Sequence, residues 1–332
     1  MSSMGASTPT PYTTLELCAG AGGQALGLEQ AGFAHVALVE LEEWACNTLR
    51  HNRPEWNVVH ADLNEWAPGV NLQNIDLLAG GVPCPPFSVA GRQLGKDDER
   101  NLFDRAIDLV AELHPRGVMI ENVRGLLDPK FSSYREEILQ RLNSMGYYGE
   151  WKLIHASDFG VPQLRPRAIL IALNKLDKQF FDWPTPVPDS TPTVGETLVD
   201  LMRERGWKGA DQWAKHANRI APTLVGGSKK HGGPDLGPTR ARHAWGELGV
   251  TGTSIADSAP EPNFEGKPRL TPQMMARIQG FPDSWHITGK KTNACRQIGN
   301  AFPPPVAKAI GSAIISAFQE TDSHRAPRSD RP

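Results

Sequence analysis

The sequence has few cysteines and no long apolar run. Its 332 residues contain four cysteines, Cys18, Cys46, Cys84 and Cys295, with no CxxC pair and no short regular spacing. This argues against a zinc site or a disulfide framework, so we expect free thiols and no bound metal. The apolar stretches are far shorter than the roughly 20 residues that span a bilayer, and the start, MSSMGASTPT, lacks the features of a signal peptide. We expect a cytoplasmic protein without a membrane partner.

The net charge of −2 gives no sign of a polyanionic partner, but the charges are unevenly distributed. Residues 1–65 contain eight acidic and two basic residues, whereas residues 203–243 contain nine basic and three acidic residues. This distribution favours an acidic half that handles a cationic or neutral small molecule and a basic half that faces phosphates. Ordinary variation among solvated faces is the alternative.

The first half of the chain alternates strand-like and helix-like segments. The expected strands include 13–17, 35–39, 75–79, 117–120 and 168–173, and the amphipathic stretches between them include 102–113 and 134–145. Strands separated by helices predict crossover connections, and therefore an α/β, doubly wound, mostly parallel sheet. We assign residues 1–174 to this catalytic and cofactor-binding domain.

The composition changes after Leu173. Residues 175–268 are rich in Pro, Gly and polar residues, which predicts a smaller second domain, or a long insertion, of loops and short strands around one helix near 195–205. Helices are expected again at 272–279 and 305–318, so residues 269–320 form a C-terminal segment that returns to the first domain. Residues 321–332 form a polar tail that we expect to be disordered.

The stretch LELCAGAGGQALGLEQAGF leads from a strand through a glycine-rich turn into a helix. Gly20, Gly22 and Gly23 allow a sharp turn and a close approach of a ligand to the backbone. Glu40 ends the next strand, where a carboxylate can accept hydrogen bonds from ribose hydroxyls, and Asp62 follows another short apolar run and could bind an adenine amino group. The loop lacks the GxGxxG pattern, which favours an adenosyl ligand over a dinucleotide; a tight structural turn is the alternative.

Two further strand ends carry reactive groups. GGVPCPPFS places Cys84 directly after an apolar run, where open α/β sheets bind ligands, and the thiolate of a cysteine is a strong nucleophile. The loop continues as VAGRQLGKDDERNLF and could close over a substrate as a lid. In VMIENVRGLL, Glu121 ends an apolar strand, where burial can keep a carboxyl group protonated as a proton donor.

Together these motifs resemble the cytosine-C5 DNA methyltransferase family, of the bacterial modification methylase type, over roughly residues 13–315. The blocks appear in the family's order: ELCAGAGG, LVE, GGVPCPPFS, ENVRG, GVPQLRPR, then a variable region, RLTPQMMARIQGFPDSW and QIGNAFPPPVAKAIG.

The resemblance implies a DNA (cytosine-5)-methyltransferase that uses S-adenosylmethionine. Cys84 would add to C6 of a cytosine flipped out of double-stranded DNA, and Glu121 would hold or protonate N3. Arg165 would hold the pyrimidine carbonyl and help to position the thiol, whereas Arg167 would be structural. The enzyme would be the modification half of a restriction system, or a solitary relative.

The resemblance also implies the binding residues. Those for the cofactor are Cys18, Ala19, Gly20, Gly22, Gly23, Glu40, Leu41, Asp62, Leu63, Gly81, Pro83, Leu102, Asn300, Ala301 and Phe302. Because Asn300 and Phe302 come from the far end of the chain, the last helix must pack back beside the first strand.

In this family the variable region reads the DNA. Basic residues on its glycine-rich loops could hold phosphates, and arginine can pair with guanine. The DNA-binding candidates, from this region and from the thiol loop, are Ser88, Arg92, Arg100, Lys229, Lys230, His231, Arg240 and Arg242. We expect a monomer, and a cognate restriction endonuclease would act on the same site without a stable complex.

The chain departs from the family pattern at three positions. Pro85 replaces the usual glutamine of PCQ, and Cys18 replaces a phenylalanine that would contact adenine. Met274 replaces a glutamate in TPQMMAR, which puts one structural polar contact in doubt.

Three alternatives remain open. An RNA-modifying member of the family would share this chemistry, although the long variable region favours DNA. A catalytically silent DNA-binding protein is disfavoured by the intact Cys84, Glu121 and Arg165. A nicotinamide-dependent oxidoreductase is disfavoured by the missing third glycine and by a thiol loop that it would not need.

Overall fold

The computed structural model describes residues 11–69, 72–83, 100–187, 191–226 and 234–325, without the side chains of residues 100 and 101. The strands are β1 (Thr13–Leu17), β2 (Ala34–Glu40), β3 (Val58–His60), β4 (Leu77–Gly80), β5 (Gly117–Val123), β6 (Tyr147–His155) and β7 (Pro166–Asn174). The helices are α1 (Gly23–Ala31), α2 (Glu43–Asn52), α3 (Arg100–Leu113), α4 (Ser132–Ser144), α5 (Lys175–Lys178), α6 (Val194–Arg203), α7 (Ala210–His216), α8 (Thr239–Glu247), α9 (Pro272–Ile278), α10 (Lys291–Asn300) and α11 (Pro304–Arg325).

The seven strands form one sheet in the order β3-β2-β1-β4-β5-β7-β6. The pairs among the first five strands are parallel, and β7 runs antiparallel to both β5 and β6. The chain crosses from β1 outwards to β3 and then returns to β4 on the other side of β1. The prediction of an α/β, doubly wound, mostly parallel sheet is therefore confirmed.

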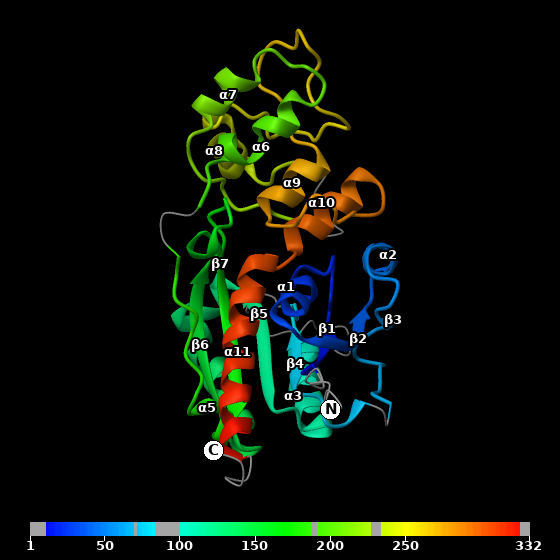
Figure 1. The fold of residues 1–332 in the computed structure, drawn as a ribbon, viewed down its shortest axis with the longest axis vertical. Coiled ribbons are helices and arrows are strands. Elements are labelled where there is room, and N and C mark those ends of the chain that lie inside the picture. Colours follow the sequence, from blue (N-terminus) through cyan, green and yellow to red (C-terminus); the bar gives the residue numbers. More distant parts are fainter. Residues whose placement is uncertain (1–10, 70–71, 84–99, 188–190, 227–233, 326–332) are drawn as a thin grey trace, which may run out of the picture.

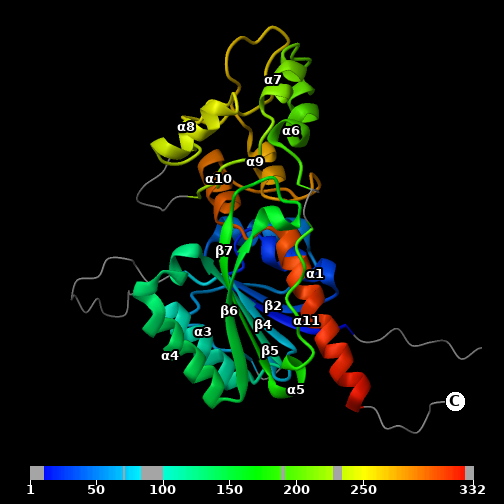
Figure 2. The ribbon, with the colours of Figure 1, turned by 90° about the vertical axis from the view of Figure 1, so that its left-hand side faces the viewer.

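Helices cover both faces of the sheet, because alternate residues of each strand point to opposite sides. Leu77 and Ala79 of β4 pack with α1 and α11, whereas Leu78 packs with α3 and α4. Figure 2 shows the two layers, with α3 and α4 on one side of the sheet and α1 and α11 on the other. This arrangement leaves the carboxyl ends of the parallel strands open towards the second lobe.

The C-terminal helix α11 lies against α1, near the opposite end of the chain (Figure 1). Glycines allow this contact: a Cβ at Gly27 would lie 2.4 Å from the Pro304 carbonyl oxygen, and one at Gly311 would lie 2.9 Å from Leu28. The helical stretch Lys291–Arg325 is the one part of the described chain long and apolar enough to cross a bilayer, but 67% of its most apolar window is buried in the protein, as in a core helix.

The expectation that the disordered tail begins at residue 321 is wrong, because α11 continues to Arg325. Thr321 is buried, and Asp322 accepts hydrogen bonds from the Tyr12 hydroxyl at 2.8 Å and from Arg116 Nη1 at 3.1 Å. These contacts anchor the last helical turn to the sheet domain. The remaining tail, residues 326–332, lies outside the described residues.

The second lobe is built from helices and loops (Figure 1). The short strands expected in residues 175–268 do not occur in the described part of that range; α6, α7 and α8 are present instead. Three tryptophans, Trp207, Trp213 and Trp245, form part of its core, and the Nε1 groups of the first two donate to the carbonyls of Phe264 and Gly249. Buried aromatic side chains thus replace a sheet as the organising element.

Candidate active site

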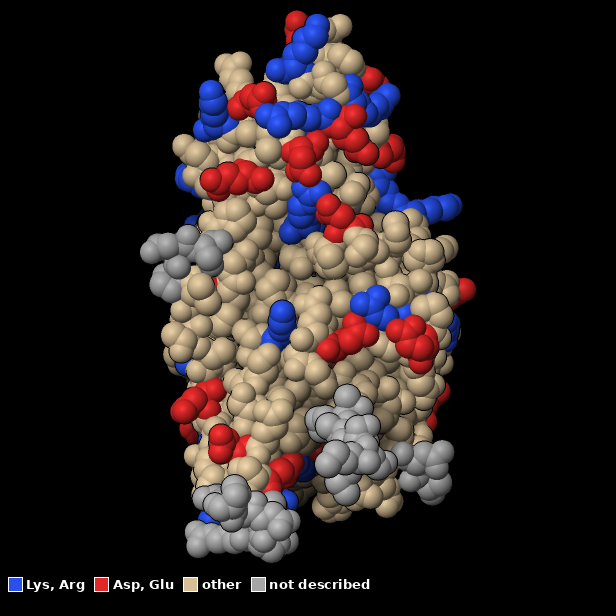
Figure 3. Space-filling model, in the orientation of Figure 1, with Lys and Arg blue, Asp and Glu red and all other residues tan. Residues whose placement is uncertain are grey.

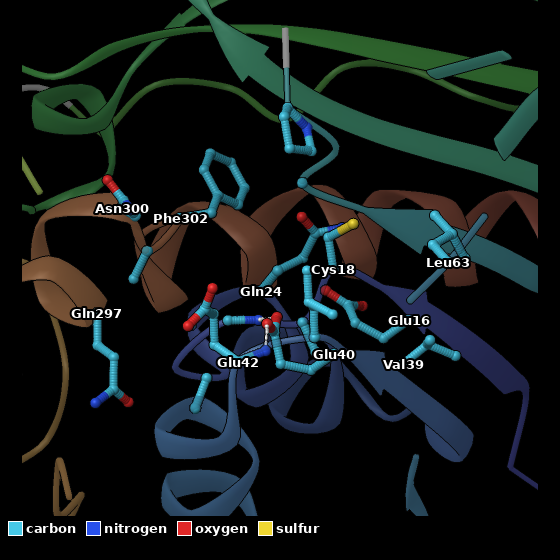
Figure 4. Close-up of a pocket in the computed structure, with 18 of the residues that line it drawn as sticks. Glu16, Cys18, Gln24, Val39, Glu40, Glu42, Leu63, Gln297, Asn300 and Phe302 are labelled. Carbon is cyan, nitrogen blue, oxygen red and sulfur yellow. Dashed lines mark hydrogen bonds between the residues drawn. The ribbon is translucent and has the colours of Figure 1, made fainter. Parts of the chain in front are cut away.

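Residues predicted for the site lie at or near the carboxyl ends of five neighbouring strands. Along the sheet they are Asp62 after β3, Glu40 at the end of β2, Cys18 after β1, Gly81 after β4 and Glu121 in β5. They line a cavity of ≈ 320 Å³, whose opposite wall comes from the end of α10 and the segment between α10 and α11 (Figure 4). This volume falls within the range of small-molecule sites, and the position is where open α/β sheets bind ligands.

The cavity brings together most of the residues proposed for the cofactor. Those that line it are Cys18, Ala19, Gly20, Gly23, Glu40, Leu41, Asp62, Leu63, Gly81, Pro83, Leu102, Asn300, Ala301 and Phe302. Gly22 does not line it. A Cβ there would lie 2.6 Å from Leu49 and 2.9 Å from Trp285, so this glycine faces the hydrophobic core behind the loop.

The glycine loop has a left-handed backbone at alternate positions. Cys18, Gly20 and Gly22 have φ values of 52°, 54° and 82°. Glycine adopts this conformation without cost, but Cys18 is strained by about 1–2 kcal/mol. Strain of this kind persists where the surrounding structure enforces it, and here it turns the chain sharply from β1 into α1.

The carboxylate of Glu40 is held by two backbone N–H groups, one from the glycine loop and one from the turn after β2. Its Oε2 accepts from the Gly20 N–H and its Oε1 from the Glu42 N–H, both at 2.7 Å. Burial raises the pKa of the Glu40 carboxyl, and these hydrogen bonds act against that rise. After the neighbouring strand β3, Asp62 Oδ1 accepts from the Asn64 N–H at 2.9 Å, which orients that carboxylate.

Glu121, in β5, lies beside Gly81, where the thiol loop leaves β4. A Cβ at Gly81 would lie 3.3 Å from Glu121 Oε2, so the glycine leaves room for this carboxylate. The neighbouring Asn122 donates from Nδ2 to the Val82 carbonyl at 3.0 Å, which ties β5 to the chain that leads to Cys84. Cys84 and Pro85 themselves lie outside the described residues.

The two arginines of the QLRPR motif lie in environments opposite to those expected from the sequence. Arg165 is 0% exposed, and it donates to the carbonyls of Leu224, Gly299 and Ala301 at 2.8–2.9 Å. It cannot hold a substrate carbonyl, because its Nη groups bind backbone from the second lobe and from the α10–α11 segment. Arg167 instead contacts a residue of the cavity wall, because its Nε forms an ion pair with Glu121 Oε1 at 2.6 Å.

The second lobe contacts the cavity wall directly. A Cβ at Gly226 would lie 2.1 Å from Asn300 Oδ1, and one at Gly299 would lie 2.3 Å from the Gly226 nitrogen. Gln163 supports this junction by accepting from the Leu224 N–H at 2.9 Å. The segment that leads into the variable-region loop is therefore packed against a residue of the cofactor cavity.

Few of the DNA-binding candidates fall within the described structure. Ser88, Arg92, Lys229, Lys230 and His231 lie outside the described residues, and so does the side chain of Arg100. Arg240 is exposed on α8. Arg242 donates from Nε to the Gly237 carbonyl at 2.8 Å, so it anchors a turn of the second lobe.

The cavity wall also contains polar residues that were not predicted from the sequence: Glu16, Gln24, Glu42, Arg296 and Gln297. Glu16 and Gln24 are the most deeply buried of these. Glu16 is 1% exposed in β1, and Gln24 is 4% exposed in the first turn of α1. A charged residue in the otherwise apolar end of TTLEL was a signal for the first. No comparable signal marked Gln24, because one amide is unremarkable in a helix.

The departure at Met274 has a structural counterpart. Thr271 Oγ1 accepts from the Met274 N–H at 3.2 Å, and the Thr271 N–H donates to Met274 Sδ at 3.4 Å. The methionine sulfur thus occupies the place of the carboxylate in a capping box, although sulfur is a weaker acceptor. The polar contact that the missing glutamate put in doubt is kept in weaker form.

Charged side chains on the face drawn in Figure 3 gather on the second lobe, where both signs alternate, and much of the sheet domain below is uncharged. This face therefore has no continuous basic surface. The charged residues of the cavity wall, in contrast, are predominantly acidic: Glu16, Glu40, Glu42, Asp62 and Glu121 line it together with Arg296.

Comparisons with a family model and with individual proteins all point to the same family. Residues 12–316 match the model of the family described as C-5 cytosine-specific DNA methylase. The chain is 56% identical over 309 residues to Type II methyltransferase M.NaeI of Lentzea aerocolonigenes, covering 92% of this chain and 75% of that protein. It is 54% identical over 310 residues to Type II methyltransferase M.NgoMIV of Neisseria gonorrhoeae, covering 93% and 99%.

Solved structures share the fold. The Dnmt2 methyltransferase of S. pombe aligns with a TM-score of 0.63 and 17% identity, over 93% of this chain and 98% of that one. A DNMT2 variant of Spodoptera frugiperda aligns with a TM-score of 0.63 and 19% identity, over 92% and 99%.

Proposed function

Because the chain belongs to the family of C-5 cytosine-specific DNA methylases, we propose that it methylates C5 of a cytosine flipped out of double-stranded DNA, with S-adenosylmethionine as methyl donor and Cys84 as nucleophile. It is a DNA (cytosine-5)-methyltransferase and the modification enzyme of a restriction-modification system. The observation that carries the proposal is the Glu121–Arg167 ion pair at the edge of a cavity of cofactor size.

The residues of the cavity fit S-adenosylmethionine. Its acidic wall suits a ligand with positive sulfonium and ammonium groups, and two buried polar side chains there have atoms without protein partners. Glu40 would accept from the ribose hydroxyls and Asp62 from the adenine amino group. When bound, the cofactor supplies an electrophilic methyl group.

Cys84 begins the reaction by adding its thiolate to C6 of the cytosine. Glu121 stabilises the adduct by giving a proton to N3, so that the electrons of the C5–C6 double bond become available at C5. Arg167, paired with Glu121, would direct its guanidinium to the O2 oxygen and stabilise the charge that develops there. Arg165 holds the surrounding backbone and takes no part in the chemistry.

Release of the product restores the double bond. After C5 has gained the methyl group, a base removes the C5 proton, the bond between Cys84 sulfur and C6 breaks, and N3 returns its proton to Glu121. The target atoms are inaccessible in a stacked duplex, so the base must be flipped out, at a cost of a few kcal/mol that the pocket recovers.

We propose that the DNA lies between the sheet domain and the second lobe, whose residues 175–268 read its sequence. The junction of Gly226 with Asn300 would then couple the recognition segment to the cofactor cavity. We expect a cytoplasmic monomer that shares its target with a cognate endonuclease without a stable complex.

We also propose that the target sequence is the one modified by M.NaeI and M.NgoMIV. The identity of 54–56% to these two proteins extends over 92–93% of the chain, whereas it falls to 37% for M.PspPI over a similar share. Alignments of this extent include the variable region. An identity this high over alignments that include the variable region supports a target shared with these relatives.

Bisulfite sequencing of DNA from a host that expresses this chain tests the proposal. We expect methylation at one cytosine of one short sequence, and the same positions in hosts that express either relative. Assays of the purified protein on duplex DNA and on transfer RNA separate the DNA enzyme from an RNA-modifying relative. Methylation of transfer RNA alone would contradict the proposal.

A further inference from the structure

Two buried polar side chains in the cavity have atoms with no hydrogen-bond partner in the protein. They are the carboxamide of Gln24, at both its nitrogen and its oxygen, and Oε2 of Glu16. Gln24 is 4% exposed and Glu16 is 1% exposed. In proteins the great majority of polar groups as buried as these have a hydrogen-bond partner. Groups without one in a cavity wall therefore indicate a ligand.

The strand order indicates which part of a bound ligand Gln24 and Glu16 would contact. Asp62 follows β3, Glu40 ends β2, and Gln24 is carried by the helix that follows β1, the next strand along the sheet. A nucleoside whose base and ribose contact Asp62 and Glu40 therefore extends its 5′ substituent towards Gln24. Figure 4 shows Gln24, Cys18 and Glu16 close together in this central part of the lining.

The start of α1 adds to this arrangement. Its N-cap is Gly22, no side chain caps it, and no acidic residue lies in its first turn. A Cβ at Gly23 would lie 2.1 Å from the Phe302 carbonyl oxygen, so the helix begins against the α10–α11 segment. An uncapped helix N-terminus favours a negative group, and the Gln24 amide beside it supplies a neutral donor.

We propose that Gln24 binds the amino-acid end of the cofactor, with its amide nitrogen donating to the α-carboxylate, while Glu16 Oε2 accepts from the α-ammonium group. This inference rests on the proposed use of S-adenosylmethionine. Burial raises the pKa of the Glu16 carboxyl, and an ammonium group beside it would restore its charged form. Gln24 is thus a binding residue that the motif-based assignment does not include.

Two probes separate the amino-acid end from the rest of the ligand. S-adenosylhomocysteine has this end, whereas 5′-methylthioadenosine has the same nucleoside and thioether without it. The dissociation constants of both are measured by calorimetry for the wild type and for Gln24→Leu, Glu16→Gln and Glu40→Ala. Leucine matches glutamine in size but forms no hydrogen bonds.

We expect Gln24→Leu to weaken S-adenosylhomocysteine binding about 10-fold to 100-fold, the range for a hydrogen bond to a charged group, and to change methylthioadenosine binding less than about 2-fold. Glu16→Gln should show the same selectivity. Glu40→Ala should weaken both probes, because both contain the ribose. Gln24→Leu should also melt at the same or a higher temperature without ligand, since it removes an unpaired amide.

If Gln24→Leu loses affinity for both probes equally, or if its affinity for S-adenosylhomocysteine is unchanged, the inference is overturned. Failure of the wild type to bind S-adenosylhomocysteine would contradict the proposed function itself, so the two failures are distinguishable. If Gln24→Leu melts lower without ligand and loses affinity for both probes, Gln24 has a structural role only.

Discussion

Arg167 Nε lies 2.6 Å from Glu121 Oε1, across the antiparallel pairing of β7 with β5. The pair connects the carboxylate proposed to protonate cytosine to the arginine proposed to hold its carbonyl. Because both side chains come from adjacent strands of a rigid sheet, their geometry is established before the substrate binds. Preorganised charges of this kind are the most effective in catalysis.

Replacement by lysine should have different effects at Arg165 and at Arg167: loss of stability at the first and loss of activity at the second. Arg167→Lys keeps a positive charge beside Glu121 but loses the planar guanidinium, so we expect methyl transfer to fall about 10-fold to 100-fold with a change in stability below about 1 kcal/mol. Arg165→Lys cannot serve three backbone carbonyls equally, and it should lower the free energy of unfolding by about 3 kcal/mol. Methylation kinetics and thermal unfolding of both variants test this; the reverse pattern would contradict the assignment.

The end of α11 should be needed for stability. Truncation after Glu320 removes the buried Thr321 and the acceptor Asp322 that Tyr12 and Arg116 share. We expect a loss of about 1–2 kcal/mol and a melting temperature a few degrees lower, because Asp322 is partly exposed and its ion pair is screened. Truncation after Arg325 is the matched control and should melt like the full chain. Equal melting temperatures for both truncations would refute the structural role of the last turn.

His35 should make the protein sensitive to acid. Burial lowers the pKa of His35 to about 4. Its Nε2 contacts the Ala25 carbonyl, and Nδ1 has no hydrogen-bond partner that could accept from it once it is protonated. The unfolded chain, with a pKa of 6.5, binds more protons than the folded chain between about pH 6.5 and 4, so stability falls as the pH falls through that range. We expect this residue to contribute ~2 kcal/mol of that loss, after allowing for solvent.

Replacement by glutamine isolates this effect from the acidic groups that titrate in the same range. His35→Gln keeps a donor for the Ala25 carbonyl but cannot be protonated. Its stability relative to the wild type should be unchanged at neutral pH and should rise as the pH falls towards 4, as measured by denaturant unfolding. A difference that does not depend on pH would show that His35 does not titrate in this way.

Five of the seven strands were predictable from the sequence because they are short apolar runs separated by amphipathic helices, each a strong local signal. The other two, β3 and β6, were not named, because β3 is only three residues long and β6 contains several polar residues. The second lobe was not predictable, since α7 and α8 are short and lie among Pro- and Gly-rich segments that conceal their periodicity. The choice between Arg165 and Arg167 also needed the structure. Arg165 precedes β7 while Arg167 lies within it, so the alternation of a strand does not relate their directions.

The residues of the site also divide into those that the sequence could predict and those that needed the structure. Glycines and carboxylates at strand ends could be assigned because the position of a strand end follows from the fold class. Gln24 could not be assigned, because its role depends on an unpaired amide and on the segment around Phe302, which is distant in sequence. Local patterns predict elements, whereas contacts between distant elements decide which polar groups lack a partner.

The central claim is that Cys84 attacks C6 of a flipped cytosine beside Glu121 and Arg167. The most direct measurement uses duplex DNA that contains 5-fluorocytosine at the modified position, incubated with S-adenosylmethionine and analysed on a denaturing gel. Fluorine at C5 cannot leave as a proton does, so the adduct is trapped. The account predicts a covalent complex with the wild type and none with Cys84→Ala, although that variant still binds the DNA. A covalent complex with Cys84→Ala, or none with an active wild type, would contradict it.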